Sequence, residues 1–114
     1  MIAVWKFPLR LEPGVLLPVI MPAGAQILTA QMQAGKLVFW ARVDTGAENQ
    51  TRFLCVVTTG RADLDQIKMN TAVYIATVQI VGEIGTLVFH IFEVDPPLGL
   101  KPIRRFAEME IATQ

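Results

Sequence analysis

The 114-residue sequence contains no serine, one histidine and one cysteine. The missing serine excludes a hydrolase built on a Ser-His-Asp triad, and so few histidines and cysteines argue against a zinc site. Cys55 has no second cysteine with which to form an intramolecular disulfide. It lies in the apolar run FLCVV, where a buried, unreactive thiol is expected. This cysteine usage fits a reducing, intracellular setting.

Charged residues are also scarce and evenly balanced. Ten basic and ten acidic side chains make up 18% of the chain, against about 25% in a typical domain. A protein that binds polymeric nucleic acid usually carries a basic excess on one face, because phosphate contacts supply most of its affinity. We therefore expect no nucleic-acid polymer as a partner. A small nucleotide-like ligand needs only a few cations and stays open.

Apolar residues, by contrast, make up 53% of the sequence. A chain of this length forms one domain, predicted here over residues 1–114, with a modest core. So small a domain has too much surface for its volume to bury all of this apolar area within itself. We therefore predict a homo-oligomer, for which two-fold symmetry is the commonest arrangement.

Residues 13–35 carry no charge and are long enough to span a bilayer. Pro13, Pro18 and Pro22 interrupt the stretch, however, and a helix there would lose backbone hydrogen bonds in lipid. We expect neither a membrane segment here nor a signal peptide at the amino terminus, which lacks a basic segment followed by an apolar core.

Period-two patterns predict short strands along the chain. In the first of these, Trp5 falls on the apolar face and is expected in the core, while Pro8 indicates an edge position because it has no amide proton for a ladder. The strands are expected over residues 3–9, 16–21, 25–33, 37–43, 52–59, 72–81 and 86–94, with that over 16–21 the least clear.

Two pairs of these runs are separated by short glycine-containing turns and predict β-hairpins. The first turn is Gln33-Ala34-Gly35-Lys36, and the second is Gly82-Glu83-Ile84-Gly85. Residues 61–70 favour a loop or one helical turn. Residues 103–112 fit a short helix slightly better than a strand. The expected fold is therefore mainly β, a small antiparallel sandwich or barrel-like sheet of about six strands with room for one short C-terminal helix.

His90 is the first candidate for chemistry, because it is the sole histidine. It shares a strand face with Val88 and Phe92, where a packed, hydrogen-bonded imidazole is expected more often than a ligand or an acid-base group. A catalytic histidine needs an orienting carboxylate, and Glu93 lies on the opposite face. We assign no catalytic residue, metal ligand or cofactor, since Asp63 and Asp65 do not form a calcium loop and no phosphate-binding motif is present.

Candidate ligand-binding residues come from three places. Trp40 and Arg42 share a face that is half apolar and half charged, which suits a subunit interface or ligand stacking. Lys101, Arg104 and Arg105 form the densest basic cluster and could hold a phosphate or carboxylate, although a solvated surface is the common alternative. His90 completes the candidate set.

Three motifs together resemble a family of short uncharacterised proteins of bacteriophages and prophages. They are VWKFPL, MPAGAQILTAQMQAGKLVFWARVD and TVQIVGEIGTLVFHIFE, which span about residues 4 to 93. The resemblance covers no part of the tail beyond Asp95, and Thr58-Thr59-Gly60 stands where such proteins often carry Gly-Thr-Gly. It implies a phage accessory protein in the host bacterial cytoplasm and assigns no activity.

Two functions follow as hypotheses. The first is a non-enzymatic, oligomeric binding protein that counters host defence, either by binding a host protein or by sequestering a nucleotide-like signal. The alternative is a structural or assembly component of the phage particle, since an exposed strand edge can pair with further copies.

Overall fold

The computed structural model describes residues 1–63 and 71–96, and these form seven β-strands and no α-helix. The strands are β1 (Ile2–Pro8), β2 (Leu17–Pro22), β3 (Gln26–Gln33), β4 (Lys36–Asp44), β5 (Asn49–Thr58), β6 (Val73–Gly82) and β7 (Gly85–Val94). The short helix expected over residues 103–112, and most of the loop or turn over 61–70, lie outside the described residues.

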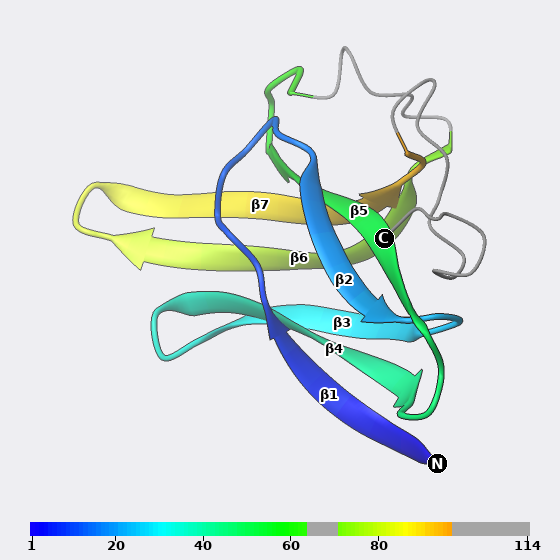
Figure 1. Ribbon diagram of the computed structural model, residues 1–114. Coiled ribbons are helices and arrows are strands. Elements are labelled where there is room, and N and C mark those ends of the chain that lie inside the picture. The colour runs from blue at the N-terminus through cyan, green and yellow to red at the C-terminus, as the bar shows by residue number, and fades with distance from the viewer. Residues whose placement is uncertain (64–70, 97–114) are drawn as a thin grey trace.

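The strands form two antiparallel sheets, one ordered β1-β4-β3 and the other β2-β5-β7-β6. Figure 1 shows the sheets packed together, with β3 of one beside β6 of the other. This small β-sandwich confirms the predicted fold class, and the strand count is seven rather than about six. The uncharged stretch 13–35 forms β2 and β3. In the described part of the chain no helix is long and apolar enough to cross a membrane.

Both predicted hairpins are present. In the β3–β4 turn, Ala34 and Gly35 have φ angles of 52° and 78°, the positive pair that a two-residue type I′ turn requires. Gly82 pairs with Gly85 at the end of the β6–β7 hairpin. The tip of that hairpin extends past its neighbour, because β5 pairs with β7 only from Phe89 to Val94.

The expected edge strand is also confirmed, since β1 is the outermost strand of the three-stranded sheet and pairs only with β4. β4 is the central strand of that sheet. Its residues alternate between the two faces, so that Phe39 points into the sandwich and Trp40 points out.

The core lies between the two inner faces and is built from aliphatic and phenylalanine side chains. Phe39 is fully buried and stacks on Phe7, with ring centroids 4.9 Å apart and planes inclined by 11°. Offset stacking at this distance adds to the stabilisation that burial alone provides. Trp5 lies on the same inner face, but 41% of it is exposed, so the prediction that it belongs to the core was wrong. It sits on the edge strand, where little packs against it.

Candidate functional site

Two of the predicted ligand-binding residues, Trp40 and Arg42, lie on the outer face of the three-stranded sheet. Trp40 is half-buried and has Lys6 and Thr29 as its cross-strand neighbours, whereas Arg42 is exposed beside Val4. We call these five residues the Trp40 face. Within the described chain, the Arg42 side chain forms no hydrogen bond or ion pair. Its guanidinium is therefore available to an external acceptor.

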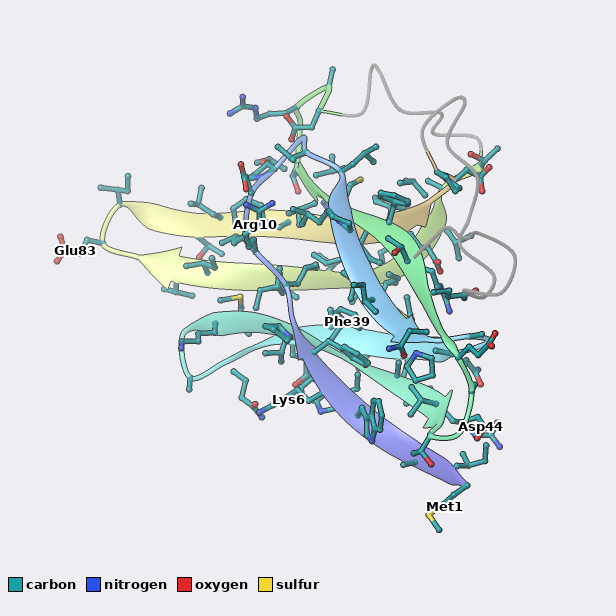
Figure 2. The ribbon with its side chains drawn as sticks, in the orientation of Figure 1. Met1, Lys6, Arg10, Phe39, Asp44 and Glu83 are labelled. Carbon is teal, nitrogen blue, oxygen red and sulfur yellow. The ribbon has the colours of Figure 1, made fainter. Side chains whose placement is uncertain are left out.

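Lys6 frames one end of the Trp40 face. Its Nζ donates a hydrogen bond of 2.8 Å to Oε1 of Gln33, reaching from β1 across β4 to β3. In Figure 2 Lys6 lies on the side of the sheet away from Phe39. The bridge passes over Val38, which is buried although it points outward. The face is thus a pleated surface with an aromatic ring, two cations and aliphatic groups.

His90 lies on the outer face of the other sheet, between Val57 of β5 and Thr77 of β6. Because the two inner faces share one core, the two outer faces point away from each other. The fold therefore does not bring His90 together with Trp40 and Arg42. The remaining predicted residues, Lys101, Arg104 and Arg105, lie outside the described residues.

Threonine hydroxyls engage both ring nitrogens of His90. Its Nε2 lies 2.7 Å from Oγ1 of Thr59, and its Nδ1 lies 3.0 Å from Oγ1 of Thr77, which in turn is 2.7 Å from the Tyr74 hydroxyl. Thr59 donates to the carbonyl of Val88, so its oxygen is free to accept from an Nε2–H. In this tautomer the neutral ring donates from Nε2 and accepts at Nδ1, so both nitrogens have a hydrogen-bond partner. Glu93 points to the opposite face, as predicted.

Cys55 lies on the same sheet face as His90, opposite Phe92 across the strand pair. The side chain is fully buried. Burial, with a smaller contribution from the negative charge of Asp63, raises the pKa of the thiol to about 11. The group is therefore protonated at neutral pH and is a poor nucleophile.

Sequence reasoning missed an ion pair at one end of the core. Arg52 donates from Nε and Nη2 to the two carboxylate oxygens of Glu93, at 2.6 and 2.8 Å. Its Nη1 donates to the carbonyl of Ala25, in the turn between β2 and β3. The signal available in the sequence was that Arg52 and Glu93 are each the single residue of their strand with a full charge. A pocket of about 240 Å³ opens beside the pair, but the two charges already satisfy each other.

A larger groove of about 470 Å³ lies between the β3–β4 hairpin and β6. Its walls are aliphatic, with Leu9, Met32 and Ile80 among them, and Arg10 and Lys36 lie at its rim. Arg10 forms an exposed ion pair of 3.1 Å with Glu12. An apolar groove with two cations suits an amphipathic anion better than a flat aromatic base, because it offers no ring for stacking.

Among the described residues, no group of three or more histidines, cysteines, aspartates or glutamates could hold a metal ion.

Comparison with known proteins gives one match. The model of a family described as a domain of unknown function, DUF7352, covers residues 1–99. Neither a curated protein nor a solved structure matches the chain. Because the match extends over most of the sequence, the chain belongs to the DUF7352 family.

Proposed function

We propose that this protein is a non-enzymatic binding protein and that the Trp40 face is its contact surface. The observation that carries the proposal is the pairing of a half-buried tryptophan with an exposed arginine that has no partner in the described chain. Tryptophan and arginine are the residue types that most often dominate the affinity of protein interfaces.

The state of the reactive side chains supports binding rather than catalysis. His90 has a hydroxyl on each ring nitrogen, and Cys55 is buried with a raised pKa. A catalytic histidine needs a carboxylate that orients its ring, and a nucleophilic cysteine needs a lowered pKa. Neither condition is met by these two groups.

The shape of the Trp40 face favours a protein as the ligand. Small-molecule sites are concave, whereas this face is the outer surface of a sheet and lines neither of the two pockets described above. The shape of the Trp40 face and the resemblance to phage proteins together support an accessory protein that binds a host protein in the bacterial cytoplasm and so counters host defence. Sequestration of a nucleotide-like signal has weaker support, because the groove with Arg10 and Lys36 at its rim offers two cations for a phosphate but no aromatic ring for a base.

The test is quantitative affinity capture from bacterial lysate with three tagged proteins: the wild type, Trp40→Ala and Arg42→Ala. The matched control is Glu83→Ala, an exposed residue in the turn between β6 and β7, on the other sheet. We expect one host protein enriched by the wild type and the control. Each of the two test variants should weaken its binding at least about 10-fold when measured with the purified partner, as for a hot-spot residue.

Equal capture by all four proteins would contradict the proposal. Native mass spectrometry of the purified protein separates the alternatives. A bound small molecule that is lost on Lys36→Ala favours sequestration, and recovery of the protein in purified phage particles favours a structural role.

A further inference from the structure

The outer edge of β1 carries backbone amides and carbonyls that form no ladder with any described strand. Among the described strands, β1 pairs with β4 on one side and has no neighbour on the other. The amide of Leu9 donates to Leu37, and the carbonyl of Met1 accepts from Thr45. With the register of the pair, these bonds place the backbone groups of odd-numbered residues toward β4. The amides and carbonyls of Ile2, Val4 and Lys6 therefore point away from the sheet.

Exposed apolar side chains lie on both faces of this edge. Ile2 and Val4, on the outer face, are 56% and 58% exposed, and Trp5, on the inner face, is 41% exposed. Proteins usually protect a long edge strand against pairing with another chain. Here that protection is weak. The Lys6 side chain is hydrogen-bonded to Gln33 across the sheet, and Pro8 removes an outward backbone donor only at the end of the strand.

We infer that two copies of the chain associate through antiparallel pairing of their β1 edges, with the two-fold axis at Val4. Val4 then faces Val4 of the second copy, and Ile2 faces Lys6 of the second copy. Each facing pair exchanges two backbone hydrogen bonds. The result is a continuous six-stranded sheet made from the two three-stranded sheets.

Side-chain sizes match in this register. Trp5 of one copy lies directly opposite Ala3 of the other on the inner face, in a position without ladder hydrogen bonds, where side chains approach most closely. Alanine is a small side chain and leaves room for the indole. Pro8 opposes a slip in register, because a shift that centred the pair on Lys6 would place Pro8 opposite Val4, where an amide donor is needed.

The outer face also brings an acidic and a basic group within reach of each other, while Asp44 keeps its ion pair of 3.3 Å with the N-terminal ammonium. Asp44 lies beside Ile2 on β4, so in the paired sheet it is two strands away from Lys6 of the second copy. Lys6 already spans two strand spacings when it reaches Gln33. Figure 1 shows β1 on the side of the molecule away from the four-stranded sheet, so none of the described strands covers this edge.

The first test measures mass in solution by analytical ultracentrifugation, with circular dichroism as the check on folding. The wild type is expected as a dimer of twice 12.6 kDa at roughly 100 µM, a concentration that populates even a weak interface. Val4→Pro removes an outward amide and no hydrogen bond to β4, so it should fold and weaken dimerisation at least about 10-fold. Val4→Thr keeps the amide and should dimerise like the wild type.

A monomeric wild type, or a folded Val4→Pro variant that still dimerises, would overturn the inference. If Val4→Pro does not fold, a second experiment decides. In a Cys55→Ala background, Val4→Cys should form a covalent dimer on mild oxidation, whereas Leu28→Cys, an exposed position on the far strand β3, should not. Absence of the Val4→Cys crosslink would also overturn the pairing. None of these outcomes depends on a host partner, so they are separate from the proposed function.

Discussion

At the scale of single residues, the environment decides what each reactive group can do. The sole histidine has its two nitrogens occupied by threonines, and the sole cysteine is buried on the same face of the sheet. Both residues thus have their polar atoms engaged or enclosed within the four-stranded sheet. Arg42 is the contrasting case, since it is charged, exposed and unpaired within the described residues.

Cys55 makes the stability of the fold sensitive to alkaline pH. Its pKa rises from 9.0 to about 11 on folding, so between these values the folded state holds a proton that the unfolded state has lost. Stability from this group is complete below pH 9 and falls as the pH rises toward 11, by roughly 3 kcal/mol at most. Urea unfolding at pH 7, 9 and 10.5 should give a steeper loss for the wild type than for Cys55→Ala. Parallel pH profiles would contradict this.

At the scale of elements, the stability of the β3–β4 hairpin depends on the backbone conformation of its turn. Ala34 occupies a left-handed conformation that costs an ordinary residue about 1 kcal/mol, and Gly35 occupies the next one without cost. An added Cβ at Gly35 would meet no atom within 4 Å, so a substitution there changes only the backbone energy.

We expect Gly35→Ala to lower the free energy of unfolding by about 1 kcal/mol, and Ala34→Asn to raise it by up to about 1 kcal/mol, because asparagine tolerates positive φ. Gly46→Ala is the matched control, since Gly46 has no positive φ and should be neutral or slightly stabilising. Thermal unfolding followed by circular dichroism measures all three. An equal loss for Gly35→Ala and Gly46→Ala would argue against the strained turn.

The elements are also the part of the fold that sequence predicts best. Alternation and glycine placement are local properties, and they gave both hairpins, the edge position indicated by Pro8 and the opposite faces of His90 and Glu93. They carry no information about which sheet a strand joins. For that reason they could not show that Trp40 and His90 point away from each other, or that Arg52 meets a carboxylate 41 positions along the chain.

At the scale of the whole molecule, Arg52 connects segments that are far apart in sequence. It joins β5 to β7 through Glu93, and joins both to the turn before β3 through the carbonyl of Ala25. The side chains of the pair are only 18% and 25% exposed, so solvent screens them weakly. Arg52 therefore links two strands of the four-stranded sheet to the turn that leads into β3 of the other sheet.

Removing the carboxylate should leave a partly buried charge without its main partner. We expect Glu93→Ala to lower the free energy of unfolding by about 2–3 kcal/mol, as for the loss of charged hydrogen bonds. The same substitution at Glu12, whose ion pair with Arg10 is exposed, should change it by less than about 0.5 kcal/mol. Urea titration of both variants gives the comparison, and similar values for the two would mean that the buried pair contributes little.

The strand order also determines which sheet has all of its strands first as the chain is synthesised on the ribosome. The three-stranded sheet has all its strands once residue 44 has been made, because β1 needs only β4 and β4 follows β3 directly. β2 is made early but belongs to the other sheet, and its partner β5 begins only at Asn49. The core-facing Phe89 and Ile91 arrive last, on β7. During synthesis the strands of the three-stranded sheet are therefore all present before those that cover its apolar inner face, which has no complete cover until β5, β6 and β7 have been made.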